Sequence, residues 1–147
     1  MANTTVTEIT DKKVWEDFLF KHSEANFLQS WNWGKFHKSL NQKIQRSGFY
    51  EEEKLVGVML SVVENAKRGK YLTVPGGPII NWQDKNLGYK FVEEIRRIAK
   101  SERCVFIRVR PQLASDDFSK KLFKELKFKN APMHLHAELT SQLDVTP

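Results

Sequence analysis

Apolar residues follow two different periods along this chain, and the change from one period to the other predicts a mixed α/β fold. Spacing typical of amphipathic helices covers 11–22, 31–40, 84–100 and 116–126, and runs typical of strands cover 44–50, 55–63, 70–75, 104–109 and 133–145. Thr10, Ser30 and Ser115 stand where helices are expected to begin, because their hydroxyls can accept hydrogen bonds from free backbone N–H groups. The order starts with a helix and predicts a mixed, largely antiparallel sheet flanked by helices.

The stretch from Lys70 to Trp82 organises this prediction, since an apolar strand runs there into the sequence Pro-Gly-Gly-Pro at 75–78. Proline fixes φ and lacks a backbone donor, whereas glycine allows positive φ or the close approach of another group. The chain is therefore expected to leave the sheet at this corner. Two interpretations stay open: a plain connection from a strand to a helix, or a place where a ligand meets the backbone.

Length and composition indicate one folded domain over residues 1–147, with 40% hydrophobic residues to supply its core. Twenty-four Lys and Arg against eighteen Asp and Glu leave a formal charge of +6, which favours phosphate groups, nucleic acid or an anionic membrane face as partners. The single cysteine, Cys104, excludes a disulfide framework and a cysteine-built metal site, and an inert buried thiol is expected. A cytoplasmic location is expected, because the sequence shows neither a leader pattern nor an apolar stretch of membrane-spanning length.

The order of elements is similar to that of the GNAT acetyltransferases, in which a glycine-rich loop between the fourth strand and its helix binds the pyrophosphate of coenzyme A. Residues 75–82 occupy that place here. The two prolines of this segment cannot donate, and no Arg or Gln precedes a Gly-x-Gly or Gly-x-Ala pattern. We therefore expect a GNAT-like fold without a coenzyme A site.

Four segments, in order, resemble the FemAB family of peptidoglycan bridge-forming aminoacyltransferases, whose members carry two GNAT-like halves in one chain. The sequence Phe-Leu-Gln-Ser-Trp-Asn-Trp at 27–33 looks like the family's Phe-x-Gln-x-x-x-Trp opening, and Gly-Pro-Ile at 77–79 is similar to its Gly-Pro-Val corner. Residues 106–111 look like its apolar strand that ends in an acid and a proline, and residues 140–145 are similar to its Thr-x-x-Leu-Asp-Leu. The resemblance covers nearly the whole sequence.

The resemblance implies transfer of an amino acid from aminoacyl-tRNA to an amine on the stem peptide of a UDP- or lipid-linked muramyl-pentapeptide precursor. It implies no metal and no acetyl coenzyme A, so no cofactor is expected. Both substrates are polyanions, and a basic surface would bind their phosphates with marked salt dependence. The chain would then be the first half of a two-half enzyme, inactive without the missing C-terminal GNAT-like half, and a peripheral contact with the inner membrane face stays open.

Five residues are candidates for substrate binding, and no catalytic residue is assigned. In the family, a lysine that contacts the precursor's phosphates stands where this chain has His37, and the resemblance implies a phosphate contact there. Lys35 and Lys38 are the neighbouring cations that could supply the charge. The alternative is a histidine at the edge of the core between two solvated lysines. Trp33, the tryptophan of the opening motif, either stacks on a base or sugar or packs in the core. The resemblance places an acid at Arg110, which cannot act as a base but either binds phosphate or carboxylate or stays solvated.

His134 and His136 share one face of the last predicted strand, but no third ligand stands at a telling spacing, so no metal site is expected. Two other classes of function stay open. One is a small-molecule N-acetyltransferase of GNAT type with an aberrant coenzyme loop. The other is a non-catalytic basic domain that binds RNA or other polyanions.

Overall fold

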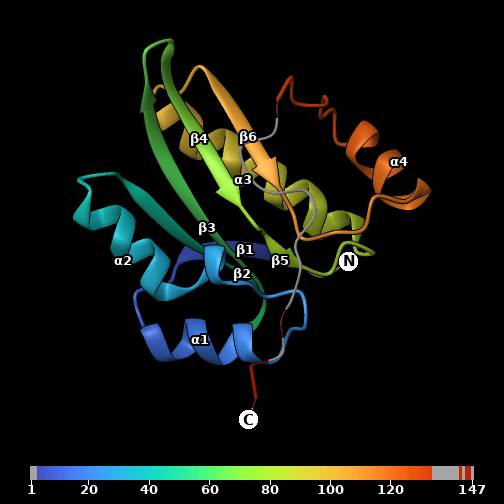
Figure 1. Cartoon of the computed structure of the whole chain (residues 1–147). Coiled ribbons are helices and arrows are strands. Elements are labelled where there is room, and N and C mark those ends of the chain that lie inside the picture. Colours follow the sequence, from blue (N-terminus) through green and yellow to red (C-terminus); the bar gives the residue numbers. More distant parts are fainter. Residues whose placement is uncertain (1–2, 134–142, 144, 147) are drawn as a thin grey trace.

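The computed structural model describes residues 3–133, 143, 145 and 146, and it shows a six-stranded sheet with helices on both faces (Figure 1). The strands are β1 (Thr4–Glu8), β2 (Ile44–Glu51), β3 (Lys54–Ala66), β4 (Gly69–Pro75), β5 (Ile79–Ile80) and β6 (Phe106–Arg110). The helices are α1 (Lys12–Phe20), the 3-10 helix η1 (Phe27–Gln29), α2 (Trp31–Ser39), α3 (Lys85–Ser101) and α4 (Asp117–Glu125). The predicted mixed α/β architecture is confirmed.

The sheet has the order β1-β2-β3-β4-β6, and β5 pairs with β3 off this path. The pairs from β1 to β4 are antiparallel, whereas β4 and β6 are parallel, with Tyr71 opposite Phe106 and Pro75 opposite Arg110. Strand β1 is absent from the sequence prediction. The expectation that the chain leaves the sheet at residues 75–78 is wrong, because β5 pairs with β3 directly after this corner.

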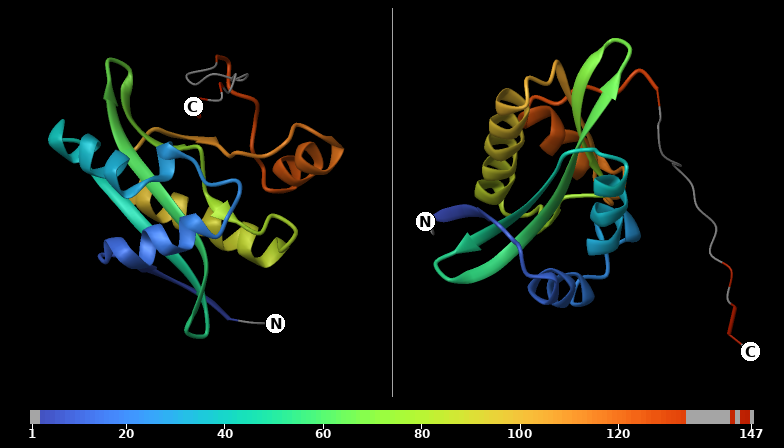
Figure 2. Two further views of the ribbon diagram at one scale, coloured as in Figure 1. Left: turned by 60° about the horizontal axis from the view of Figure 1, so that its bottom comes forward. Right: turned by 90° about the vertical axis from the view of Figure 1, so that its left-hand side faces the viewer.

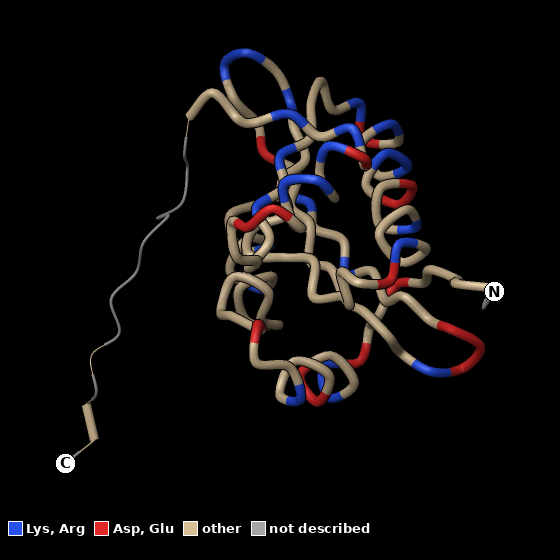
Figure 3. The backbone as a smooth tube through the Cα atoms, turned by 90° about the vertical axis from the view of Figure 1, so that its right-hand side faces the viewer, with Lys and Arg blue, Asp and Glu red and all other residues tan. Residues whose placement is uncertain are grey.

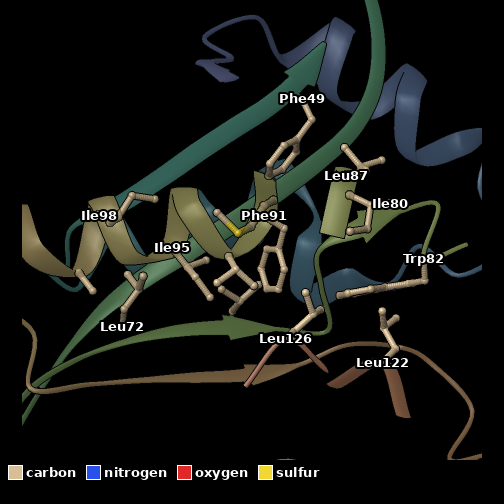
Figure 4. Close-up of a cluster of buried hydrophobic side chains, with 14 of the residues drawn as sticks. Phe49, Leu72, Ile80, Trp82, Leu87, Phe91, Ile95, Ile98, Leu122 and Leu126 are labelled. Carbon is tan, nitrogen blue, oxygen red and sulfur yellow. The ribbon is translucent and has the colours of Figure 1, made fainter. Parts of the chain in front are cut away.

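Two apolar cores lie on the two faces of the sheet, which stands between α3 on one side and α1 and α2 on the other (Figure 2). The core under α3 and α4 is the larger one, and it contains Phe49, Leu72, Phe91 and Ile95 (Figure 4). The core under α1 is built around the fully buried Trp15. The central strand β3 contributes to both cores, as the run of apolar residues at 55–63 predicts.

The helices begin close to the predicted positions, but two caps differ from the prediction. Asp11 rather than Thr10 caps α1, and Asp116 rather than Ser115 caps α4. Each carboxylate accepts hydrogen bonds from first-turn N–H groups and also interacts favourably with the helix dipole, an advantage that a hydroxyl lacks. Ser30 caps α2 as predicted, its Oγ accepting from the backbone N–H of the third residue of the helix at 3.1 Å.

Helix α2 is rotated relative to the predicted orientation. The apolar spacing of residues 31–40 predicts one face made of Trp33, Phe36, His37 and Leu40. Of these His37 is buried together with Gly34, but Phe36 and Leu40 are 46% and 54% exposed. A Cβ at Gly34 would lie only 2.5 Å from Nη2 of Arg46 on β2, so the missing side chain lets the helix approach the sheet there. In α4, the apolar spacing predicts a buried stripe of Phe118, Leu122 and Leu126; the two leucines are buried, whereas Phe118 is 38% exposed. Most of the last predicted strand, with both of its histidines, lies outside the described residues.

Candidate functional site

The side chain of Gln29 takes the place of a strand in the middle of the sheet. Strand β3 pairs with β4 from Val62 onward and with β5 up to Val58, which leaves Leu60 between the two ladders. The fully buried Gln29 Nε2 donates to the carbonyl oxygens of Leu60 at 3.1 Å and Pro75 at 2.7 Å, and its Oε1 accepts from the Leu60 N–H at 2.8 Å. One amide therefore satisfies both backbone groups of Leu60 and ties β3 to the end of β4.

The two glycines at the end of β4 make room for side chains from the segment before α2. A Cβ at Gly77 would lie 2.4 Å from Cδ of Gln29, and a Cβ at Gly76 would lie 2.2 Å from Oδ1 of Asn26. Asn26 Nδ2 also donates to the carbonyl oxygen of Gly76 at 2.7 Å, where φ is +63°. The group that approaches this backbone closely thus belongs to the protein itself. The Gln motif and the Gly-Pro corner are the two sides of one structural contact.

A second region lies beside α2, on the face of β4 and β6 that is turned away from α3 and that no described helix covers (Figure 1). Ile107 and Val109 of β6 pack against the core under α3, so strand alternation directs their neighbours to the opposite face. The ring of Tyr71 stacks on Phe106 with centroids 4.7 Å apart and planes 8° apart. We call this surface the open face; it consists of Tyr71, Phe106, Arg108 and Arg110, together with the buried Thr73.

A chain of hydrogen bonds joins α2 to the edge of the open face. His37 Nδ1 lies 2.5 Å from Gln42 Oε1, and Gln42 Nε2 donates to Glu64, which stands opposite Tyr71 on β3. An ionised carboxylate can only accept, so the Gln42 amide turns its nitrogen to Glu64 and its oxygen to His37. The imidazole must therefore carry a proton on Nδ1. In its neutral form, Nε2 is then the atom that can accept a hydrogen bond or a proton.

Charge on the open face comes from residues that stand on neighbouring strands. Burial raises the pKa of Tyr71, and the negative charge of Glu64 raises it further, whereas the Arg108 guanidinium acts in the opposite direction. The Tyr71 hydroxyl therefore stays a neutral donor and acceptor. Arg108 also donates to the backbone carbonyl of Met133. The surface thus offers a phenol and two guanidinium groups, with a carboxylate at its edge.

Trp33, His37 and Arg110 are the predicted site residues that lie in or next to this region. Trp33 packs against Phe27, Phe36 and His37 at centroid distances of 5.3, 5.1 and 5.2 Å. His37 is 9% exposed, and Arg110 ends β6 on the open face. Trp33 is half-buried, so its ring forms an apolar wall on this flank of α2.

Lys35 and Lys38 lie on the other flank of α2. Trp31, one turn before Lys35, lies under the guanidinium of Arg46 on β2, 3.7 Å from Cζ to the ring centroid, and its carbonyl accepts from Arg46 Nη2 at 2.9 Å. Gly34, one turn before Lys38, faces the same arginine. Strand β2 is separated from β4 by β3, so the structure places both exposed lysines away from the open face.

Sequence reasoning missed Gln42, Glu64, Tyr71 and Arg108 as neighbours of the site. Glu64 and Tyr71 face each other across the turn between β3 and β4, and the register of that hairpin was the one signal that could have paired them. The link from His37 through Gln42 depends on how α2 ends, which the pattern of apolar residues does not reveal.

The residues at the start of α3 do not fit the pyrophosphate of coenzyme A. The carboxylate of Asp84 accepts from the backbone N–H groups of Asn86 at 2.9 Å and Leu87 at 3.2 Å. These are donors that an anion at a helix N-terminus would need, and a second negative group next to the carboxylate would be repelled. Trp82, just before the helix, packs in the core under α3.

The described part of the chain offers neither a metal cluster nor a membrane-spanning helix, and its one cysteine is not activated. Within residues 3–133, 143, 145 and 146, no group of three or more His, Cys, Asp or Glu side chains could hold a metal ion. None of the helices found there is long and apolar enough to cross a membrane. Burial raises the pKa of the half-buried Cys104 thiol, Lys70 opposes this and Glu102 adds to it, so the thiol stays protonated at neutral pH.

Comparison with solved structures defines the class of the fold. A possible acetyltransferase from Clostridium difficile 630 matches with a TM-score of 0.62 over 95% of this chain and 99% of that chain, at 14% identity. A transcriptional regulator from Bacillus halodurans C-125 matches with a TM-score of 0.66 over 93% of this chain and 100% of that chain, also at 14% identity. At such identity the likeness is one of fold, and it confirms a GNAT-like domain.

The sequence itself identifies the family. The FemAB family profile matches residues 10–139, and the chain therefore belongs to the FemAB family. The structure of FemX is similar, with a TM-score of 0.76 at 19% identity over 85% of this chain and 32% of that chain. This chain thus spans about a third of the length of FemX. No curated protein sequence matches it.

Proposed function

We propose that this chain is the precursor-binding part of a peptidoglycan interpeptide-bridge aminoacyltransferase. In the reaction, an amine of a muramyl-pentapeptide precursor attacks the ester carbonyl of aminoacyl-tRNA. The C–N bond forms, the C–O bond to the ribose breaks, and the ribose hydroxyl leaves with a proton equivalent to the one that the amine loses. The FemAB family match over residues 10–139 is the observation that carries this proposal.

The open face and the adjoining flank of α2 are the proposed contact with the precursor. The permanent charge of Arg110 suits a pyrophosphate or a stem-peptide carboxylate, since a guanidinium can bind either through two parallel hydrogen bonds. His37 would add a hydrogen bond through Nε2, and Trp33 would provide the apolar wall. Lys35 and Lys38 remain the alternative phosphate contact, on the opposite flank of the same helix.

Transfer is proposed to need more protein than this chain provides. FemX extends well beyond the 32% of its length that matches here, and the resemblance implies a second GNAT-like half in such enzymes. The precursor would then bind between two halves, with this domain as one wall. We expect the isolated chain to bind the precursor and to transfer no amino acid, and efficient transfer by it alone would contradict this division of labour.

Calorimetric titration with UDP-MurNAc-pentapeptide, beside UDP and a generic polyanion at two salt concentrations, tests the proposal. We expect saturable binding of the precursor that the polyanion does not reproduce. The Arg110→Ala or His37→Ala change should weaken it by about tenfold, the loss expected when one hydrogen bond to a charged group is removed. The double change of Lys35 and Lys38 to Ala is the matched control on the same helix and should leave the affinity unchanged.

If the double change of Lys35 and Lys38 weakened binding and the changes of Arg110 and His37 did not, the phosphate contact would lie on the lysine flank of α2. Binding of UDP alone with the same affinity as the precursor would show that the stem peptide is not read by this domain. If the chain binds no precursor, a two-half protein that carries it should be titrated in the same way. Absence of binding there as well would refute the proposed function.

Titration with acetyl coenzyme A tests the N-acetyltransferase alternative. We expect no binding, because the Asp84 carboxylate already accepts from the N–H groups at the start of α3. Saturable binding of acetyl coenzyme A would favour the small-molecule acetyltransferase instead.

A further inference from the structure

The net positive charge of the chain comes from the side of the molecule opposite the α1 and α2 face. Segments 85–101 and 117–129 together carry ten Lys or Arg and four Asp or Glu, an excess that equals the entire formal charge of +6. Figure 3 shows how these positions are distributed along the backbone. The remaining residues carry equal numbers of cations and acids, so α3, α4 and the turn after α4 supply the excess positive charge that would attract a polyanion.

Ion pairs use three of the four acids in these segments and leave the excess of cations unpaired. Lys85 pairs with Glu125 at 3.3 Å, Lys90 with Glu93 at 3.0 Å, and Arg97 with Glu94 at 2.7 Å. Seven cations in these two segments have no ion pair within the described chain: Arg96, Lys100, Lys120, Lys121, Lys124, Lys127 and Lys129. Neutralisation within the protein therefore does not explain this surface.

A groove of about 510 Å³ runs between α3 and α4 in the middle of this surface. Lys85, Tyr89 and Arg96 line it from α3, and Glu125 and Lys127 line it from the other side. The three α3 residues are spaced by four and seven positions, so they form one stripe of about 16 Å along the helix at 1.5 Å per residue. Tyr89 is 56% exposed between Lys85, which pairs with Glu125 across the groove, and Arg96, which has no ion pair within the described chain.

We propose that the α3–α4 groove binds the phosphate backbone of an RNA. A concave, cation-lined channel with an exposed aromatic ring matches a chain of phosphates that also carries flat bases, because phosphates pair with Lys and Arg and every base can stack on an aromatic face. A lipid surface would instead require apolar side chains that project from a convex face. Among the described residues of α3 and α4, Tyr89 and Phe118 are the exposed large apolar side chains.

For aminoacyl transfer, RNA binding in this groove rests on the proposed function. It would place the RNA substrate on a surface separate from the precursor site. The open face and the α3–α4 groove lie on opposite faces of the sheet. The precursor and the RNA would then bind this domain independently. Loss of one binding event should leave the other intact.

Fluorescence anisotropy with labelled bulk transfer RNA tests the inference on the isolated chain over a range of salt concentrations. Changing Arg96 and Lys127 together to Ala should weaken binding by about tenfold or more at 0.1 M salt and should lower the salt slope by about 1.4 to 1.8, as expected when two phosphate contacts are lost. Tyr89→Ala should weaken binding about fivefold without changing the slope, since stacking is lost while charge is kept. The double change of Lys67 and Arg68 to Ala, in the turn between β3 and β4, removes the same charge elsewhere and should have a small effect.

Equal losses in the groove variant and the turn variant would overturn the proposal, because they would show attraction to overall charge alone. Absence of RNA binding with precursor binding retained would refute the groove while leaving the proposed function standing. Absence of precursor binding, both by this chain and by a two-half protein that carries it, would refute the proposed function instead. Vesicles that contain anionic phospholipid form the second arm. Vesicle binding that depends on Arg96 and Lys127, without RNA binding that depends on them, would assign the surface to a membrane and reject RNA.

Discussion

Replacing Gln29 should destabilise this domain more than the removal of any exposed polar side chain. A Gln29→Leu change keeps a side chain of similar size but removes the partner of three buried backbone groups, the N–H and carbonyl of Leu60 and the carbonyl of Pro75. A buried polar group without a partner costs about 1–3 kcal/mol, so the three groups together should cost about 3 kcal/mol or more. Small domains have a total free energy of unfolding of about 5–15 kcal/mol, so the loss should be readily measured.

Urea-induced unfolding followed by tryptophan fluorescence measures this loss, and Gln83→Leu, at an exposed position, is the control. Gln29→Glu adds a second test, because a carboxylate can still accept from the Leu60 N–H but cannot donate to either carbonyl oxygen. We expect this variant to be at least as unstable as Gln29→Leu at neutral pH. A free energy of unfolding within about 1 kcal/mol of the wild type for both variants would refute the structural role assigned to the amide.

Two further predictions concern stability. Gly77→Ala should lower the free energy of unfolding by about 1–3 kcal/mol in the same urea assay, because its Cβ would lie 2.4 Å from Gln29 Cδ, and an unchanged midpoint would show that the corner can relax. Burial raises the pKa of Glu94, but hydrogen bonds from Arg97 and Ser47, together with the charge of Arg97, outweigh burial and hold that pKa below its ordinary value. The ionised Glu94 therefore stabilises the fold fully above the pKa that this group has in the unfolded chain, and the stabilisation is lost as the pH falls through its pKa in the folded protein. Glu94→Gln should make the urea midpoint fall less steeply when the pH is lowered from about 7 to 3. An acid limb as steep as that of the wild type would contradict this role.

The apolar pattern of the sequence was sufficient to predict an element where one spacing, helical or strand-like, persists through a long segment. Helix α3 was predicted at 84–100 and spans Lys85–Ser101, because apolar residues recur along one face through its whole length. Strand β1 was missed because Thr-Thr-Val-Thr-Glu holds one strongly apolar residue, Val6, and an edge strand needs little more than that.

The candidate site was harder to predict than the fold, because it depends on orientation and register. A helical wheel alone turns Phe36 and Leu40 inward, whereas the close approach at Gly34 turns them outward. His37 lies on α2, in a segment that was predicted to be helical, but its partner Gln42 and the carboxylate beyond it become neighbours only once the helix and the hairpin are in place. Whether His37, Trp33 and Arg110 bind substrate stays a prediction.

The amide of Gln29 has a consequence for aggregation. Interior strands are normally shielded along their whole length by neighbouring strands, but on one side of Leu60 the shield is a side chain from the 3-10 helix η1. If η1 lifted away, an apolar strand in the centre of the sheet would expose a free backbone edge, which is a template for pairing with another chain. Local opening of a few surface residues would then be enough to start self-association while the rest of the domain stays folded.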